Sequence, residues 1–352
     1  MADPMIKDIK SQPEYLNKLL SNYFEDTKPE YKKRLIEVVH HIENNNDPIL
    51  FAGMGSSNYA AVSAINILSN KGYLCINPDI DEFIHYQMNS LNRSFTVIAI
   101  SQSGESVETK RLLEKLPKNN TVIAITNDED SPIADMSDFV LPIFAGEEAT
   151  ISTKTYANSN YLLNIIAHLV DNNDSFDIQK QLDDIEIIDD FISQEEISVH
   201  DLYNHIKSKD KWSFISRGDL LSTTFMGSLI CEEGTGLQPA GYSGGAFRHG
   251  PLEITGENHG AIVFAHGDHT FNLLMKLTEE MAKNGSRIIL LTDESYNNKS
   301  DNILLNKVPI VNRLLLSTIY AVIIQLFTRE TALNRGRIPG VLNKISKVTE
   351  EE

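Results

Sequence analysis

The chain has 352 residues, which is long enough for two domains that each bury a core. Its 49 acidic side chains outnumber the 31 basic ones, and the net charge of −18 argues against binding to nucleic acid or to an anionic membrane. The two cysteines, Cys75 and Cys231, both predicted to be buried, exclude a disulfide framework and a paired-cysteine metal site, and the lack of a secretory signal pattern predicts a cytoplasmic protein.

Helical patterns dominate the first 47 residues. Pro13 and Pro29 each stand where a helix can begin. An acidic helical stretch follows at 179–196, and the apolar stretch 314–327 is too short to span a bilayer, so it predicts a core helix. The predicted organisation is a helical segment (1–47), a first domain (48–170), a helical connector (171–210), a second domain (211–328) and a C-terminal tail (329–352).

Two parts of the chain repeat each other. In each part, three apolar runs end in a small or polar residue and lead into a helical pattern. Three run ends pair at offsets of 163, 165 and 166 residues: Gly55 with Gly218, Ser101 with His266, and Thr126 with Thr292. A nearly constant offset indicates that one structural unit occurs twice.

The apolar runs also predict the fold class. Short unbroken runs of Val, Ile, Ala and Leu, such as 96–100, are typical of strands buried on both faces of a parallel sheet. Each unit alternates strand and helix three times, so we expect an α/β protein with two tandem doubly wound parallel-sheet (flavodoxin-like) domains. Ligands of such folds bind beyond the carboxyl ends of the strands.

One of these carboxyl ends is followed by a loop rich in hydroxyl groups. Residues 101–106, Ser-Gln-Ser-Gly-Glu-Ser, come directly after the predicted strand 96–100, and a helix is predicted from Val107 to Leu116. The N–H groups that begin a helix and the serine hydroxyls can hold an anion without a metal or a lysine. The sequence therefore predicts a site for a phosphorylated small molecule, and the alternative is a serine-rich helix cap.

Two carboxylates stand at a predicted helix end in the second half. The helix after Gly218 runs to Glu232 and Glu233, and we expect Gly234 and Gly236 to end it directly afterwards. The helix dipole disfavours a carboxylate at a helix C-terminus. The position of Glu233 therefore fits either a solvated helix end or a base with a raised pKa.

Two further side chains are candidates for acid–base or amine chemistry. His249 precedes a Gly-Pro pair, so we expect it in a turn, where it either faces a ligand or stays at the surface. The same Phe-x-His pattern ends at His85, 164 residues earlier, and no function follows for that histidine. Lys344 in the tail either acts as an amine above a pocket or belongs to a solvated terminus.

Together these motifs resemble the double sugar isomerase (SIS) domain family, above all the isomerase half of glucosamine-6-phosphate synthase. The resemblance implies a phosphosugar isomerase or deaminase that needs no metal and no cofactor. It implies that Glu233 moves a proton between C1 and C2, that His249 opens the sugar ring from the second subunit of a homodimer, and that Lys344 forms a Schiff base with a ketose. The residues that it assigns to the sugar phosphate are Gly55, Ser56, Ser57, Ser101, Gln102, Ser103, Ser106, Thr150 and Ser152.

The chain departs from the synthase pattern in three ways. We find no counterpart of its glutaminase domain, Ile230 and Glu232 stand where the synthase has two lysines, and the segment after Glu233 is unusually rich in glycine. Three interpretations therefore remain open. The first is an isomerase or deaminase of hexose or amino sugar 6-phosphates, the second is a fructosamine 6-phosphate deglycase, and the third is a phosphosugar-binding regulator without activity.

Overall fold

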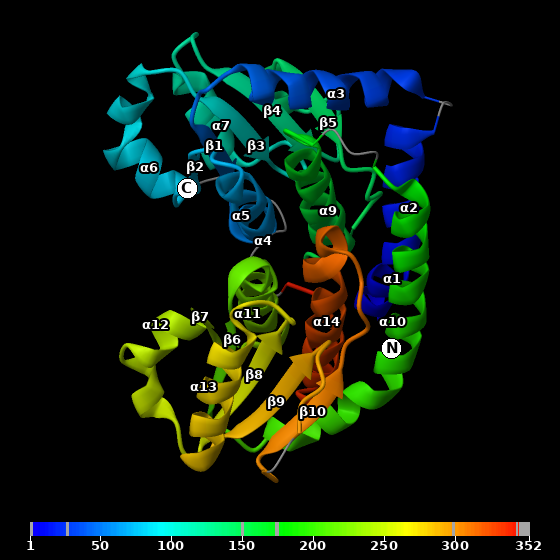
Figure 1. Cartoon of the computed structure of the whole chain (residues 1–352), viewed down its shortest axis with the longest axis vertical. Coiled ribbons are helices and arrows are strands. Elements are labelled where there is room, and N and C mark those ends of the chain that lie inside the picture. Colours follow the sequence, from blue (N-terminus) through cyan, green and yellow to red (C-terminus); the bar gives the residue numbers. More distant parts are fainter. Residues whose placement is uncertain are drawn as a thin grey trace. The chain divides into compact units, whose positions relative to one another are not determined.

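The computed structural model describes residues 3–25, 28–148, 151–172, 176–297, 300–342 and 344. The chain divides into two compact units, each built on one sheet (Figure 1). The unit that we call N-terminal contains Ser11–Glu148, Lys154–Leu182 and Asn343–Glu352. The unit that we call C-terminal contains Met1–Lys10, Ala149–Thr153 and Asp183–Leu342.

The N-terminal sheet has five parallel strands in the order β2-β1-β3-β4-β5. This is the flavodoxin-like order that the sequence predicts. Every residue of β1 and β3 is buried, as their unbroken apolar runs require. The strands are β1 (Ile49–Gly53), β2 (Cys75–Ile76), β3 (Thr96–Ile100), β4 (Thr121–Thr126) and β5 (Phe139–Pro142).

Helices cover both faces of this sheet. One face packs through Leu50, Val97 and Val122 against α6 and α7, while α5 and α9 pack together on the other face. Pro13 and Pro29 lie in the first turns of their helices, as predicted. The helices are α2 (Gln12–Phe24), α3 (Pro29–Asn44), α4 (Gly55–Ala60), α5 (Val62–Asn70), α6 (Ile80–Tyr86), η1 (Met88–Asn92), α7 (Val107–Lys115), α8 (Pro132–Asp135) and α9 (Lys154–Leu169).

The C-terminal sheet repeats this topology. Its five parallel strands have the order β10-β9-β8-β6-β7, so the first, second and third strands take the same places as in the other sheet. Gly55 and Gly218, paired by the sequence repeat, both have positive φ angles, 53° and 59°. The strands are β6 (Lys211–Ser216), β7 (Ala240–Ser243), β8 (His259–Ala265), β9 (Arg287–Thr292) and β10 (Ile303–Lys307).

The helices of the C-terminal unit include α14, which contains the predicted core helix. The stretch Arg313–Asn334 is long and apolar enough to cross a membrane, but 89% of its apolar window is buried inside the fold. The helices are α1 (Pro4–Lys10), η2 (Gly218–Leu220), α11 (Leu221–Thr235), α12 (Gly244–Arg248), η3 (Pro251–Ile254), α13 (Phe271–Lys283), η4 (Arg313–Leu315) and α14 (Leu316–Asn334); α10 (Ile178–Ile206) runs from one unit into the other.

Two expectations about the fold were wrong. Each sheet has five strands rather than three, because the short strands β2, β5, β7 and β10 have no long apolar run. Cys75 is only half-buried because it lies on the edge strand β2, whereas Cys231 is buried as expected. The helix α1, which the sequence analysis did not predict, packs on α14.

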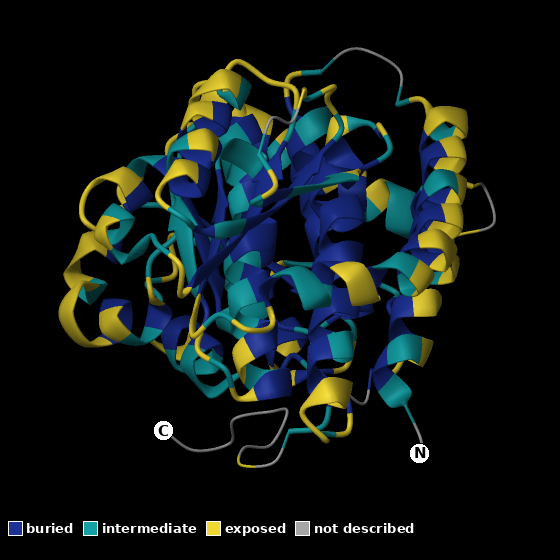
Figure 2. Cartoon of the chain, turned by 90° about the horizontal axis from the view of Figure 1, so that it is seen from below, coloured by how far each residue is buried: buried dark blue, intermediate teal, exposed yellow. Residues whose placement is uncertain are grey.

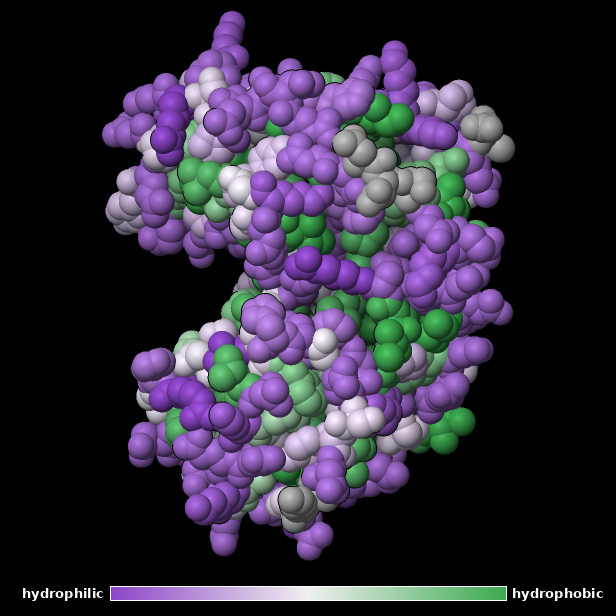
Figure 3. All heavy atoms as spheres, in the orientation of Figure 1, coloured by the Kyte–Doolittle hydropathy of each residue, from purple (hydrophilic) through white to green (hydrophobic). Residues whose placement is uncertain are grey.

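Burial follows the sheets and their inner helix faces, while the outer helix faces are exposed (Figure 2). On the face drawn in Figure 3, hydrophilic side chains predominate over both units.

Candidate functional site

The hydroxyl loop, residues 101–106, joins the end of β3 to the start of α7. Ser101 is buried, and its N–H donates to the Ile125 carbonyl oxygen at 3.0 Å. Its Oγ lies 3.0 Å from the Oγ of Ser106 and accepts a hydrogen bond from the Gly104 N–H at 3.1 Å. Because Ser106 bonds to Ser101, its side chain does not cap the N–H groups at the start of α7. Those donors therefore remain for another acceptor.

Gly104 gives this loop its shape. Its φ angle is +67°, and a Cβ atom at this position would lie 1.9 Å from the Oγ of Ser131 at the start of α8. Its carbonyl oxygen accepts from the Ile133 N–H at 3.1 Å. Only glycine combines this backbone conformation with so close an approach, so glycine at position 104 is a structural requirement of the turn.

A second loop ends at the same edge of the N-terminal sheet. Gly53 at the end of β1 pairs with Ile100 at the end of β3, so the turn that carries Gly55, Ser56 and Ser57 leaves the strand next to the hydroxyl loop. Both lie at the switch point of the strand order, where doubly wound folds bind ligands. Ser56 and Ser57 are half-buried in the first turn of α4.

Two asparagines that the sequence analysis missed lie at the same edge of the N-terminal sheet. The amide oxygens of Asn58 on α4 and Asn77 after β2 are buried, and neither has a hydrogen-bond partner among the described residues. A buried amide oxygen without a partner is costly, and a bound hydroxyl group would satisfy it. No spacing or motif in the sequence distinguishes these two from the other asparagines.

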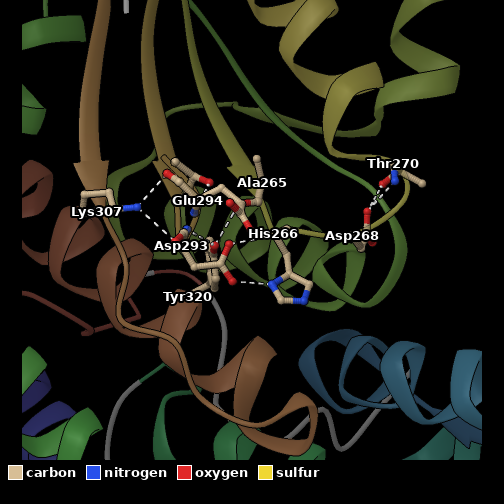
Figure 4. A network of polar contacts seen from close by, with 10 residues as sticks. Ala265, His266, Asp268, Thr270, Asp293, Glu294, Lys307 and Tyr320 are labelled. Carbon is tan, nitrogen blue, oxygen red and sulfur yellow. Dashed lines mark hydrogen bonds and ion pairs between the residues drawn. The ribbon is translucent and has the colours of Figure 1, made fainter. Parts of the chain in front are cut away.

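The corresponding edge of the C-terminal sheet has different chemistry (Figure 4). His266 follows β8 as Ser101 follows β3, and its Nδ1 is hydrogen-bonded to the Asp293 carboxylate, which also accepts from the Gly267 N–H at 2.9 Å. The Tyr320 hydroxyl donates to the Ala265 carbonyl oxygen at 3.0 Å. The hydrogen bond that His266 donates to the Asp293 carboxylate raises the pKa of His266, although burial opposes it.

Further charged groups surround this second edge. Asp219, after β6, is held by the Arg313 guanidinium through bonds of 2.6 and 3.1 Å. Asp268 accepts from the Thr270 N–H and hydroxyl, and Lys307 donates to the carbonyl oxygens of Asp293 and Glu294. Carboxylates repel a phosphate, so of the two edges the hydroxyl loop suits an anion better.

The candidate base Glu233 lies in the last turn of α11 and is half-buried, whereas Glu232 beside it is exposed. Partial desolvation raises the pKa of Glu232. The expected stop directly after Glu233 was wrong: α11 continues through Gly234 to Thr235, and Gly236, whose φ angle is +67°, caps its end. Gly234 stays helical because α14 packs on it, with Thr328 Cγ2 only 3.0 Å from where its Cβ would be.

The structure brings the segment with Ser152 to this helix end. The neighbouring Ile151 donates its N–H to the Gly340 carbonyl oxygen at 3.1 Å, and its Cδ1 lies 3.4 Å from the Cβ position of Gly234. Three segments that are far apart in sequence therefore meet in the C-terminal unit: residues 151–153, the end of α11 and the chain after α14. Thr150 lies outside the described residues.

His249 lies at the end of α12, exposed, in the expected turn before Gly250. Phe247 of α12 is fully buried, and Phe83 of α6 is also buried. The repeated Phe-x-His pattern thus places its phenylalanine in the core of each unit. The Nε2 atom of His85 lies 3.5 Å from the Oδ1 atom of Asp81, one helix turn earlier.

Lys344 is exposed in the N-terminal unit. Among the described residues, no cluster of His, Cys, Asp and Glu is suited to a metal ion.

A family model described as the SIS domain matches residues 42–169 and again residues 205–335. These two segments make up most of the chain, and the chain belongs to the SIS domain family.

Relatives of known name agree with this assignment. Glutamine–fructose-6-phosphate aminotransferase [isomerizing] of Thermococcus kodakarensis is 27% identical over 356 residues, which cover 97% of this chain and 57% of the relative. The chain thus spans a little over half the length of that relative.

Solved structures share the fold. The C-terminal domain of glucosamine-fructose-6-phosphate aminotransferase from Francisella tularensis has a TM-score of 0.82 at 20% identity, covering 96% of this chain and 98% of that one. Glucosamine-6-phosphate deaminase from Thermotoga maritima has a TM-score of 0.76 at 19% identity, covering 98% and 99%.

Proposed function

We propose that the protein is a phosphosugar isomerase-type enzyme that acts on a hexose or amino sugar 6-phosphate, with deamination as a coupled step where the substrate carries an amine. The observation that carries the proposal is the hydroxyl loop at the switch point of the N-terminal sheet, where the Ser106 side chain does not cap the N–H groups that begin α7. The names of the aminotransferase and deaminase relatives support the same class of substrate.

In this proposal the phosphate is bound by the loops after β1 and β3. Ser56, Ser57, Ser101, Gln102 and Ser103 supply hydroxyl, amide and backbone donors, and Ser106 completes the loop. Ser152, and Thr150 in the same segment, contact the sugar hydroxyls. Binding the phosphate holds the reacting carbons in place, so its binding energy contributes to catalysis away from the bonds that change.

Glu233 moves the proton in this proposal. It removes the C2 proton of the open-chain aldose while water protonates the C1 oxygen, which gives the enediol. It then returns the proton to C1 while the C2 hydroxyl loses its proton to water, so that C2 becomes the carbonyl carbon of the ketose. His249 opens the ring from the partner of a homodimer, and Lys344 holds a ketose as a Schiff base.

The test is turnover of a panel of hexose 6-phosphates, amino sugar 6-phosphates and fructosyl amino acid 6-phosphates, followed by NMR. We expect Glu233→Gln to lower kcat by at least about 100-fold and to leave phosphosugar binding intact. Glu232→Gln, the exposed neighbour on the same helix turn, is the matched control and should keep activity. Full activity of Glu233→Gln would contradict the assigned role.

The dimer proposal has its own test. If His249 acts across the interface, a mixture of Glu233→Gln and His249→Ala chains forms hybrid dimers with one intact site, and activity returns on mixing. If His249 acts within its own chain, every site in the mixture remains defective and activity does not return.

Two alternatives are separated by the same panel. Cleavage of fructosyl amino acid 6-phosphates alone would favour a fructosamine 6-phosphate deglycase. Binding without turnover across the panel would favour a phosphosugar-binding regulator.

We place the protein in the cytoplasm, which the burial of its one strongly apolar described helix supports.

A further inference from the structure

The chain that follows α14 brings two guanidinium groups to the end of α11. Arg335 donates its Nε–H to the Thr235 carbonyl oxygen at 3.1 Å. The guanidinium of Arg337 covers Gly236, because a Cβ atom built on that glycine would lie 2.3 Å from Arg337 Nη2. Both arginines therefore contact the last residue of the helix or the residue that ends it.

The backbone holds both arginines in place. The N–H groups of Arg335 and Arg337 donate to the Ala332 carbonyl oxygen at 3.1 and 2.9 Å, and Gly336 between them has a φ angle of +69°. This is a glycine-based helix C-terminus, which fixes the direction in which the chain leaves α14. The end of α14 thus determines where the two guanidinium groups lie.

Negative charge accumulates at the end of α11, and nearby positive charge would stabilise it. The last carbonyl oxygens of a helix carry partial negative charge, and α11 adds two carboxylates, Glu232 and Glu233, in its final turn. Guanidinium groups at a helix C-terminus neutralise this charge and bond to the terminal carbonyl groups.

We propose that Arg335 and Arg337 are positioning residues that hold the last turn of α11, and with it Glu233, in the geometry for proton transfer. The proposal rests on the proposed function for its consequence in catalysis, but not for the contact itself. Neither arginine touches the substrate in this proposal. Their effect passes through Thr235 and Gly236 to the helix turn that carries the base.

The experiment compares Arg335→Ala and Arg337→Ala with Arg287→Ala. Arg287 also donates to a carbonyl oxygen, that of Asp301, but it lies at the start of β9, the end of the strand away from the ligand edge. We expect each test variant to lower kcat by about 10- to 100-fold with the KM for the sugar phosphate within about twofold, since small displacements of a catalytic group have effects of this size. The control should keep both constants.

Chemical rescue separates positioning from loss of stability. Millimolar guanidinium chloride should restore several-fold activity to Arg337→Ala by occupying the space beside Gly236, while the same concentration of sodium chloride should not. A variant that is merely destabilised would not be rescued, because millimolar guanidinium changes the free energy of unfolding only negligibly. Unchanged kcat in both arginine variants, or a loss of kcat in Arg337→Ala that guanidinium does not restore, would overturn the proposal.

Hydrogen exchange measured by mass spectrometry makes this result independent of the proposed function. In both arginine variants the peptide that contains residues 229–237 should exchange faster than in the control, whether or not any sugar phosphate is converted. If the wild-type protein converts no substrate but the exchange result holds, the proposed function fails and the contact with α11 stands. If the exchange of this peptide is unchanged, the proposal fails even when the enzyme is active.

Discussion

At the carboxyl edge of the N-terminal sheet, the loop after β3 offers hydroxyl and amide donors. At the carboxyl edge of the C-terminal sheet, the loop after β8 offers an imidazole and carboxylates instead. The two sheets nevertheless have the same strand order, and both turns after the first strand begin at a glycine with positive φ. The comparison teaches that the scaffold was kept while the chemistry of its loops diverged, as expected where binding residues sit on loops held by rigid strands. The two units should therefore respond differently to equivalent substitutions.

The largest difference is expected from a negative charge in each loop. Ser103→Asp places a carboxylate among the phosphate donors, and repulsion of a dianion at about 4 Å is worth several kcal/mol in partly screened surroundings. We expect the KM for the sugar phosphate to rise by at least about 100-fold. His269→Asp, in the corresponding loop of the other sheet, should change KM by less than about twofold. Equal effects in steady-state kinetics would remove the distinction between the edges.

Alanine at two glycines with positive φ tests the packing of the same loops. At Gly104 the Cβ atom overlaps Ser131, whereas at Gly218 the nearest atom is Asp268 Oδ2 at 3.7 Å. Gly104→Ala should therefore destabilise the N-terminal unit by about 2–5 kcal/mol, and Gly218→Ala the C-terminal unit by about 1 kcal/mol. Trp212, the only tryptophan, lies in the C-terminal unit, so its fluorescence follows that unit while circular dichroism follows both. A larger effect at Gly218 would contradict the contact geometry.

Acid should unfold the C-terminal unit first. His259 is fully buried between Ser213 and Ser286, and burial lowers its pKa to about 4, from 6.5 in the unfolded chain. Its contribution to stability is complete above pH 6.5 and is lost as the pH falls towards 4, by up to about 3 kcal/mol. The half-buried His41 of the N-terminal unit has a pKa that burial lowers less. Trp212 fluorescence should change at higher pH than circular dichroism, and His259→Gln should remove most of this difference.

The smallest effect is expected on the alkaline side. Asp293 raises the pKa of His266, so the pair stabilises the C-terminal unit fully below pH 6.5 and loses this contribution as the pH rises through the raised value. Asp293→Asn should lower stability in mild acid and flatten the dependence on pH above neutrality. Urea unfolding followed by Trp212 fluorescence, at several pH values, measures this. A slope that persists in the variant would assign the pH dependence to another group.

Local patterns were sufficient for the central strands and for the hydroxyl loop. The strands β1, β3, β4, β8 and β9 carry unbroken apolar runs because both of their faces are buried, and such runs can be recognised without the fold, while β6 was recognised although Ser213 interrupts its run. The edge strand β7, Ala-Gly-Tyr-Ser, has no such run and was missed. Asn58 and Asn77 were missed for a related reason, since only the tertiary structure shows that their amide oxygens are buried without partners.

The sequence by itself determined the α/β class, the repeated topology and the glycine turns, because strand burial and positive φ angles leave a local trace in residue type. Only the tertiary structure decided where α11 ends, since Gly234 would stop a free helix but is held by Thr328 and Ile151. It also decided that residues 151–153 and the arginines after α14 meet the helix end that carries Glu233. Those contacts join residues more than 80 positions apart in the chain, and their energy depends on packing that no local pattern records.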